Sequence, residues 1–475
     1  MVLARAVRAD YGQLNDPVPA PELPGRKAHT VAMAAMRELF RVWGLDAEHF
    51  DSPAWNPLGS FIRPGSRVVL KPNWVLHWNK SGAGMECLVT HAEVIEAVLE
   101  YVALAKPGSV VLGDAPVQGC DFRELCRTCG IGPLVERFRN RGMELDVRDF
   151  RRTVLPGGKL GEARIEGSRA LENFVLFDLK RESLLEPLAL QAEKFRVTMY
   201  NPDLMRRTHG PAHHEYMIAR EIVEADTILN LPKLKTHKKA CVTGALKNMV
   251  GINGHKEYLP HHRKGGRSNG GDCYEGASWL KGRAETLLDT ANRASPGGRQ
   301  VLFSKLAYVM SRLAVTMGHD RNMEGSWYGN DTVWRMCLDL QRITRYGRPD
   351  GRLADETQRQ VISITDGIVG GEGEGPMQPT PVHCGYLTGS VNPAAAEWVH
   401  ARLMGFDPRK IPLIREAFRN FSYALADYPP SEILLHSKEG DLTEDAIFPI
   451  GRAFMPAAGW KGHCELDARP TREIR

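Results

Sequence analysis

The chain has 475 residues, of which 43% are hydrophobic, and this is enough for one large core or for two or three domains. Its first thirty residues contain Arg5, Arg8 and Asp10 but no apolar segment of the secretory type, and no apolar run reaches the roughly 18 residues of a membrane span. We therefore expect a cytoplasmic protein with no signal peptide and no membrane partner. Nine cysteines in a chain of this length do not indicate a disulfide framework.

Composition divides the chain into three parts. Residues 1–60 read as a proline-rich arm followed by a helix over 28–43, and residues 446–475 read as a tail. Between them, residues 61–445 alternate apolar segments of strand and helix type. We predict that this middle part is the main domain, with room for two lobes and with an insertion near 151–215.

Two β-branched segments of the main domain end in polar residues. Residues 66–75 lead to Lys71 and Asn73, and residues 109–113 lead to Asp114. Each precedes a predicted helix, which is typical of parallel sheets whose strand ends form ligand sites at one edge. We therefore predict an α/β fold with mostly parallel, Rossmann-like sheets flanked by helices and an inserted loop-rich region. Asp114 is either a ligand group at this edge or the cap of the next helix.

A histidine-rich loop follows. Residues 200–215 contain His209, His213 and His214 beside two arginines. Imidazoles at these spacings could meet a metal ion if the loop folds back, although Gly210-Pro211 excludes a simple helical pair. Surface or phosphate-contacting histidines are the alternative.

The positive charge of the chain is concentrated in residues 233–267, which we call the basic stretch. It holds nine Lys and Arg, four His and a single acid, whereas the whole chain has a net charge of only +5. The stretch follows a predicted buried strand over 227–231 and includes Lys233, Lys235, His237, Lys247 and Asn248. Such a concentration of charge attracts an anion, and the glycines that follow allow the backbone to approach it.

Nucleic acid is the obvious rival ligand. The basic stretch, however, has one aromatic residue apart from its histidines, Tyr258, and its cations alternate with imidazoles. Stacking platforms and continuous Lys/Arg stripes, which are typical of nucleic-acid binding, are missing from this segment. A small phosphate- or carboxylate-bearing ligand fits better, and we expect nucleic acid to be an unlikely partner.

Two later segments complete the predicted fold. Residues 301–317 form an amphipathic helix whose apolar residues we expect to pack inside. Residues 361–365 form a buried strand that ends at Asp366, and the glycine-rich segment 367–376 is predicted to be a mobile loop that carries Glu372 and Glu374. These carboxylates either bind a cationic group or lie in a solvated turn, and the strand end at Asp366 favours a functional role.

Taken together, these motifs resemble the bacterial and archaeal family named domain of unknown function 362. The matching motifs are Lys71-Pro72-Asn73-Trp74, Gly113-Asp114-Ala115-Pro116, Asn230-Leu231-Pro232-Lys233-Leu234-Lys235-Thr236-His237, Leu246-Lys247-Asn248-Met249, Gly270-Gly271-Asp272, Ser326-Trp327-Tyr328-Gly329-Asn330-Asp331-Thr332, Asp366-Gly367 with Gly371-Glu372-Gly373-Glu374-Gly375-Pro376, and Leu403-Met404-Gly405-Phe406. Their common order along the chain makes the resemblance specific.

The resemblance also raises the question of electron transfer. Many members of that family look to carry ferredoxin-type iron–sulfur segments, whereas this chain has one close pair, Cys126-x-x-Cys129, and no run of four cysteines. We therefore expect no integral iron–sulfur module. A separate electron-transfer protein is the partner to expect if the reaction needs electrons.

The function that the sequence predicts is that of an enzyme acting on a small anionic metabolite by proton or group transfer. We assign His237, Lys235 and Asp366 to catalysis. The residues assigned to substrate binding are Lys71, Asn73, Asp114, Lys233, Lys247, Asn248, Glu372 and Glu374. One alternative is a protein that uses a divalent metal, with His209, His213, His214, His261, His262 and Asp272 as ligands, and another is a non-enzymatic protein that binds an anionic polymer.

Overall fold

The computed structural model describes residues 1–23, 27–155, 166–317 and 322–467. Its centre is an eleven-stranded sheet in the order β20-β19-β1-β18-β17-β13-β4-β5-β6, with β14 and β15 attached beside β17. The strands are β1 (Val2–Arg5), β4 (Arg67–Pro72), β5 (Ser109–Asp114), β6 (Leu145–Asp149), β13 (Thr227–Leu231), β14 (Lys233–His237), β15 (Cys241–Thr243), β17 (Gln360–Glu374), β18 (Gln378–Ser390), β19 (Leu435–Ser437) and β20 (Gly440–Leu442).

Most of this sheet is parallel. From β6 through β5, β4 and β13 to β17 every neighbouring pair is parallel, and β14 also runs parallel to β17. Antiparallel pairing begins where β17 meets β18. The fold is therefore mixed α/β with a large, mostly parallel central sheet, as the strand–helix alternation predicted.

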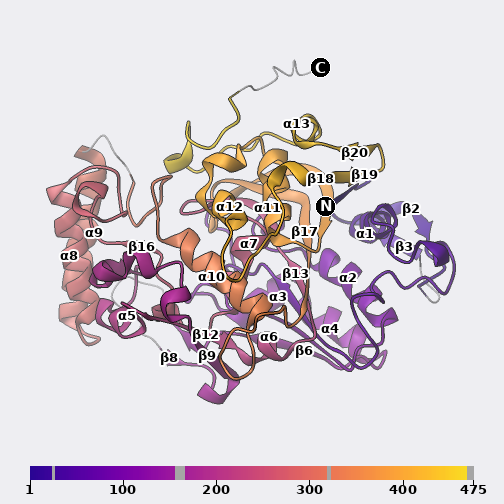
Figure 1. The fold of residues 1–475 in the computed structure, drawn as a ribbon, viewed down its shortest axis with the longest axis horizontal. Coiled ribbons are helices and arrows are strands. Elements are labelled where there is room, and N and C mark those ends of the chain that lie inside the picture. Colours follow the sequence, from indigo (N-terminus) through magenta and orange to yellow (C-terminus); the bar gives the residue numbers. More distant parts are fainter. Residues whose placement is uncertain (24–26, 156–165, 318–321, 468–475) are drawn as a thin grey trace.

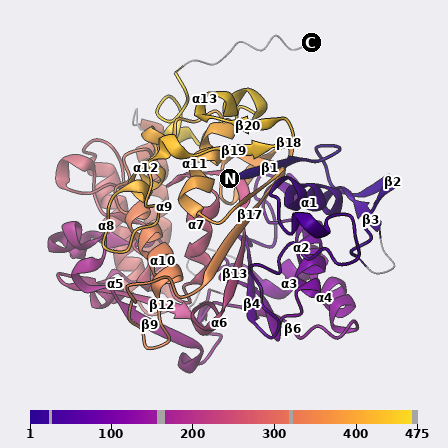
Figure 2. The ribbon, with the colours of Figure 1, turned by 45° about the vertical axis from the view of Figure 1, so that its right-hand side comes forward.

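The described chain has thirteen α-helices, several of which cover the two faces of the sheet. They are α1 (Val31–Val42), α2 (Ala92–Leu104), α3 (Phe122–Thr128), α4 (Ile131–Arg139), α5 (Pro202–Thr208), α6 (Arg220–Glu224), α7 (Ala245–Asn248), α8 (Trp279–Arg293), α9 (Gly298–Met317), α10 (Val333–Tyr346), α11 (Pro393–Leu403), α12 (Pro412–Arg415) and α13 (Glu444–Ile447). Figure 2 shows α1, α2 and α4 on one side of β4, β13 and β17, and α10, α11 and α12 on the other.

Alternation along the strands fixes the two faces. Val68 and Leu70 of β4 belong to the hydrophobic cluster that includes α1 and α2, whereas Val69 between them belongs to the cluster that includes α10 and α11. Successive side chains of a strand point to opposite faces, so a strand buried on both sides is apolar at every position. This is why β4 and β13 carry consecutive apolar residues, Val68 to Leu70 and Ile228 to Leu229, before the polar residues at their ends.

Smaller sheets surround the centre. Their strands are β2 (Gln13–Pro19) with β3 (Lys27–Thr30), β7 (Thr153–Val154) with β8 (Glu166–Gly167), β10 (Phe195–Arg196) with β16 (His262–Arg263), and β11 (His209–Gly210) with β12 (His213–Ala219) and β9 (Phe174–Asp178). In Figure 1 the hairpin of α8 and α9 stands at the left edge of the molecule. No helix in the described part of the chain is long and apolar enough to cross a membrane.

Both ends of the described chain contribute to the central fold. Strand β1 pairs with β18 and with β19, so the first residues form part of the main sheet. Near the other end, Phe454, Trp460 and Cys464 are buried in the same cluster as α10 and α11. The three-part division that composition suggests remains a prediction, and these contacts show that its outer parts pack closely against the middle one.

The glycine-rich segment predicted to be a mobile loop is instead part of a strand. β17 continues to Glu374 and stays paired with β18, from Ser363 opposite Ser390 to Glu374 opposite Gln378. The glycines serve close packing: a Cβ at Gly371 would lie 2.5 Å from the carbonyl oxygen of Cys87, and one at Gly370 would lie 2.7 Å from the Phe454 ring. Sequence alone could not distinguish this close approach from flexibility.

Candidate functional site

The ends of β4 and β5 place two predicted residues in direct contact. Lys71 Nζ lies 2.7 Å from Asp114 Oδ1, and both side chains are buried. The other carboxylate oxygen, Oδ2, accepts a hydrogen bond of 2.6 Å from the backbone N–H of Trp74. Asp114 is therefore the partner of a buried lysine, while the cap of α3 is Asp121. This geometry excludes the capping role for Asp114, and its role as a ligand group remains a prediction.

Asn248 at the end of α7 joins these strand ends to the basic stretch. Its Nδ2 donates to the carbonyl oxygen of Lys71 at 3.1 Å and to Asn230 Oδ1 at 2.7 Å, and its Oδ1 accepts from Asn73 Nδ2 at 2.9 Å. Gly251 follows closely, and a Cβ there would lie 2.0 Å from Asp114 Oδ1. A residue with any side chain at position 251 would therefore displace the buried ion pair.

A second buried ion pair joins β14 to β17. Lys233 Nζ lies 2.8 Å from Asp366 Oδ2, and neither side chain is exposed. Tyr11 bridges the pair, because its hydroxyl accepts from Lys233 Nζ at 2.7 Å and donates to Asp366 Oδ1 at 2.6 Å. The backbone N–H of His91 adds a 3.0 Å hydrogen bond to Oδ2, and its ring stacks on Tyr11. Asp366 thus holds Lys233 and is fully occupied by donors.

Four lysines of the basic stretch differ from these two pairs. We call Lys235, Lys239, Lys247 and Lys256 the lysine cluster. Lys235 and Lys247 are buried and the other two are half-buried, yet none of the four has a carboxylate within ion-pair distance in the described residues. Lys235 donates to the carbonyl oxygen of Leu88 and Lys239 to that of Glu324.

The four side chains share one electrostatic environment. Burial lowers the pKa of each, and the charge of Lys247 contributes to the lowered pKa of the other three. For Lys256 the result is a pKa of about 8, far below that of an ordinary lysine. Desolvated cations without counter-charges are costly, and proteins retain them where a ligand or a reaction uses them.

His237 lies beside this cluster with its protonation state fixed by the backbone. Its Nδ1 accepts hydrogen bonds from the N–H groups of Lys239 and Ala240, at 3.0 and 3.2 Å. Burial and then the charge of Lys247 hold the pKa of His237 well below its usual value, so the ring is neutral. Because Nδ1 is an acceptor, the proton of the neutral ring is on Nε2. His237 therefore offers a hydrogen-bond donor through Nε2–H, and the catalytic role assigned to it from the sequence remains a prediction.

His261 has the opposite arrangement. Its Nδ1 lies 2.7 Å from the carbonyl oxygen of Leu259 and so carries the proton. Burial and the charges of Lys239 and Lys247 hold the pKa of His261 well below its usual value, which leaves Nε2 as an acceptor. The lysine cluster thus borders two neutral imidazoles with opposite roles. His237 donates through Nε2, and His261 accepts through Nε2.

The remaining predicted substrate-binding residues contact the C-terminal segment. Glu372 Oε2 accepts from the backbone N–H of Met455 at 2.7 Å, and Glu374 Oε1 accepts from that of Ala458 at 2.8 Å. Glu374 also pairs with Lys238 at 3.0 Å. These contacts show what the two carboxylates hold in the structure, and a role for them in ligand binding remains a prediction.

The predicted metal ligands lie in separate contacts. His209 and His214 approach each other to 3.2 Å between their Nδ1 atoms, and the Nε2 atoms contact the Tyr258 carbonyl oxygen and Glu186. The other four are engaged elsewhere: His213 with Asp178, His261 with Leu259, His262 with Lys239, and Asp272 with Thr332 and the backbone of Arg263 and Asp331. Across the described ranges, no group of three or more His, Cys, Asp or Glu residues is arranged to hold a metal ion.

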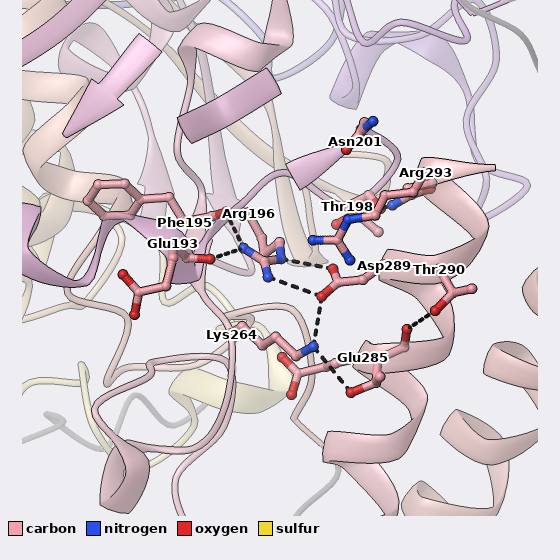
Figure 3. A network of polar contacts seen from close by, with 12 residues as sticks. Glu193, Phe195, Arg196, Thr198, Asn201, Lys264, Glu285, Asp289, Thr290 and Arg293 are labelled. Carbon is pink, nitrogen blue, oxygen red and sulfur yellow. Dashed lines mark hydrogen bonds and ion pairs between the residues drawn. The ribbon is translucent and has the colours of Figure 1, made fainter. Parts of the chain in front are cut away.

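Lys264, near the end of the basic stretch, is paired with an acid. Figure 3 shows Arg196 and Lys264 pointing at the carboxylate of Asp289 on α8. The distances are 2.8 Å from Arg196 Nε to Oδ1 and 2.7 Å from Lys264 Nζ to Oδ2. This network ties α8 to β10 and to the segment after β16, so it is a structural use of the same positive charge.

Sequence reasoning missed several residues that shape the site. Lys239 and Lys256 were counted in the basic stretch but not assigned to the site, and Asn230 was read only as part of a strand. Tyr11 gave no signal, because it reaches Asp366 from a segment 355 residues away.

Comparison with known proteins places this site within a family. Residues 68–176 and 181–402 match the family described as "Domain of unknown function (DUF362)". The chain belongs to the DUF362 family. Both buried ion pairs and the whole lysine cluster lie inside the matched residues, whereas Tyr11 lies outside them. The resemblance predicted from the motifs is thereby confirmed.

Two individual proteins resemble this DUF362 chain. A thylakoid-associated protein of Synechocystis sp. is 22% identical over 355 residues, which cover 75% of this chain and 68% of the relative. A crystal structure of a Thermotoga maritima protein matches with 12% identity and a TM-score of 0.30, over 73% of this chain and 53% of that one. The matched region thus spans about half the length of the Thermotoga protein.

Proposed function

We propose that this DUF362 protein binds a small phosphate- or carboxylate-bearing metabolite at the lysine cluster and acts on it by proton or group transfer. The observation that carries the proposal is the contrast in charge pairing within a few residues. Lys71 and Lys233 have buried carboxylate partners, whereas Lys235, Lys239 and Lys247 have none in the described residues. An anion that enters the cluster supplies the missing counter-charge.

The chemistry follows from the protonation states around the cluster. The Nε2–H of His237 is suited to donate to an oxygen of the ligand, and a neutral donor of this kind stabilises negative charge that develops during a reaction. Lys256, with a pKa of about 8, can lose and regain a proton near neutral pH. Lys235 and Lys247 hold the anion, and Asp366 acts by positioning Lys233 at the end of β14.

Burial favours a small ligand over a polymer. Lys235 and Lys247 have 0% and 8% of their surface exposed, so a nucleic-acid backbone lying on the protein surface does not reach them. Binding to nucleic acid depends on exposed Lys and Arg that follow the phosphates. We further propose that the parallel strands β6, β5, β4, β13 and β17 form a Rossmann-like platform whose carboxyl ends border the ligand.

The test is anion-dependent stabilisation. We expect polyvalent anions such as inorganic phosphate and citrate to raise the melting temperature of the wild-type protein in a saturable manner, because they bind the folded state only. Lys247→Met should remove this effect, while Lys438→Met, a change of an exposed lysine after β19, should retain it. Chloride at equal ionic strength serves as the salt control.

The outcomes separate the alternatives. Equal stabilisation of wild type and Lys247→Met would contradict the proposed site. Absence of any saturable response to the anions, together with tight polynucleotide binding that weakens steeply with salt, would favour the polymer-binding alternative instead.

A further inference from the structure

Helix α9 exposes large apolar side chains, although the sequence predicted that they pack inside. Leu302, Leu306, Val309 and Leu313 are 54%, 42%, 52% and 43% exposed. Their spacing of four, three and four residues places them on one line along a helix. Met317, at 74% exposure, extends the line to the end of α9. The helix therefore carries a continuous outward stripe.

Small residues explain why the stripe faces outward. Ser304, Ala307 and Ala314 are the buried residues of α9, and α9 is joined to α8 by the short connection 294–297. With about 100° of rotation per residue, Ser304 lies opposite the stripe, and Ala307 and Ala314 lie roughly 100–125° round the helix from its centre. Small side chains allow α8 and α9 to approach closely, so the larger residues stay outside. Figure 1 places this hairpin at the edge of the molecule, away from the central sheet.

The charges of α9 all have the same sign. Arg299, Lys305 and Arg312 are its only charged residues, and it contains no Asp or Glu. In the described part of the chain none of the three takes part in an ion pair. By helical rotation, Lys305 and Arg312 flank one side of the stripe and Arg299 the other. The exposed face is an apolar line bordered by cations.

We infer that α9 is a peripheral membrane-binding helix that inserts its apolar stripe between the headgroups of anionic lipids. Large aliphatic residues bordered by Lys and Arg are typical of helices that lie in the membrane interface, where the long cationic side chains reach the headgroup phosphates. A second copy of the chain fits less well, because two α9 helices facing each other would bring six cations together without an acid. The positive border requires an anionic partner.

In this proposal α9 binds at the membrane surface and does not cross the membrane. The expectation of no membrane partner rested on the lack of an apolar span, and an interfacial helix needs no such span. The property that matters is which face of α9 is exposed. Sequence periodicity cannot show this, because a buried apolar stripe and an exposed one have the same spacing.

The experiment is co-sedimentation of the full chain with vesicles. The probes are vesicles of phosphatidylcholine alone and vesicles with phosphatidylglycerol added to phosphatidylcholine. We expect binding to the anionic vesicles only. The variant Leu306→Ser/Val309→Ser/Leu313→Ser should bind at least about tenfold more weakly, because the inserted apolar surface is lost. Leu190→Ser, which changes an exposed leucine outside α9, should bind like wild type.

Charge reversal on α9 separates the electrostatic contribution to vesicle binding from the contribution of the apolar stripe. Lys305→Glu/Arg312→Glu should lower the affinity for anionic vesicles by about fivefold or more for each residue changed. Arg123→Glu/Arg181→Glu, which reverses two exposed arginines elsewhere, should leave it unchanged. Circular dichroism checks that each variant is folded.

Four results would overturn the inference. The first is an equal lack of binding to both vesicle types. The second is vesicle binding that the α9 variants do not alter. The third is a dimer in light scattering that the serine variant dissociates, which would assign the stripe to a second copy. Binding of the stripe to an acidic protein in place of vesicles would likewise replace lipid as the partner.

Discussion

Lys264 and Lys247 belong to the same basic stretch, but the structure treats them differently. Lys264 lies 2.7 Å from Asp289, which also binds Arg196, and this network fastens α8 to the rest of the molecule. Lys247 is buried, and the described residues provide no carboxylate to pair with it. The comparison teaches that a run of positive charge in a sequence contains both paired, structural cations and unpaired cations, for which we propose ligand binding. Pairing, not position in the run, separates the two.

The same contrast recurs over two residues of β14. Lys233 is neutralised by Asp366 and also donates to Tyr11, whereas Lys235 has only the carbonyl oxygen of Leu88. Loss of a paired lysine should therefore damage stability, and loss of an unpaired one should damage ligand binding.

The largest expected effect is from breaking the Lys233–Asp366 pair. Lys233→Met leaves the Asp366 carboxylate buried without a counter-charge, so we expect the free energy of unfolding to fall by about 3–5 kcal/mol. The measurement is urea unfolding at pH 7. Lys233→Met/Asp366→Asn removes the stranded charge and should recover part of the loss. A single variant as stable as wild type would show that the pair does not hold β14 to β17.

The pH dependence of anion binding should reveal the unpaired charge. Burial and the charge of Lys247 lower the pKa of Lys256 to about 8, so the free protein loses this proton as pH rises through that value. Anion affinity should then fall above about pH 8, by at most about tenfold per pH unit. Calorimetry in buffers of different ionisation enthalpy should show proton uptake on binding near this pH.

The lowered pKa of Lys256 also makes the folding stability depend on pH. Stability should rise with pH, whereas anion affinity should fall. Its folded-state pKa lies below the unfolded value of 10.5, so between about 8 and 10.5 the unfolded chain binds more protons. The cost of the buried charge is fully present below about pH 8 and is relieved as pH rises through the window. Lys256→Met should abolish both pH effects, whereas Lys238→Met, near Glu374, should retain them. Identical profiles for wild type and Lys256→Met would contradict the assignment.

Replacing Lys235 should change stability less than replacing Lys233 does, and it should raise the free energy of unfolding. Burial, followed by the charge of Lys233, lowers the pKa of Lys235 well below its usual value, so the charged form is unfavourable in the folded protein. Lys235→Met removes this cost, and we expect the free energy of unfolding at pH 7 to rise by about 1 kcal/mol. Anion binding should weaken in the same variant. A less stable variant would mean that the hydrogen bond to Leu88 outweighs the desolvation.

The sequence predicted the sheet and the strand-end residues because both follow from local patterns. Lys71 and Asp114 end neighbouring parallel strands, and Lys233 lies opposite Asp366 in the register of β14 and β17. Strand–helix alternation is sufficient to bring such ends to one edge. The pairing of these charges was not predictable, because it depends on which side chains meet after burial.

Other features depended on contacts between distant segments. Tyr11 reaches Asp366 across most of the chain, and the β17 glycines are in a strand because Cys87 and Phe454 pack against them. The outward stripe of α9 depends on small residues that face α8. For β17 and α9 the local composition was read correctly as glycine-rich and amphipathic, but the packing partner was unknown, and Tyr11 gave no local signal.

The protonation state of His237 should stay constant through neutral pH. Because the backbone N–H groups of Lys239 and Ala240 both donate to Nδ1, protonation of this nitrogen would break two hydrogen bonds within a group of buried cations. Nitrogen-15 NMR of labelled histidine, assigned with His237→Gln, should therefore show a neutral ring with its proton on Nε2 from about pH 5.5 to about pH 8. His436, which is partly exposed and beside Asp441, is the internal control in the same spectra. A His237 ring that titrates in this range, or carries its proton on Nδ1, would make it a base and would reverse the donor role assigned to it.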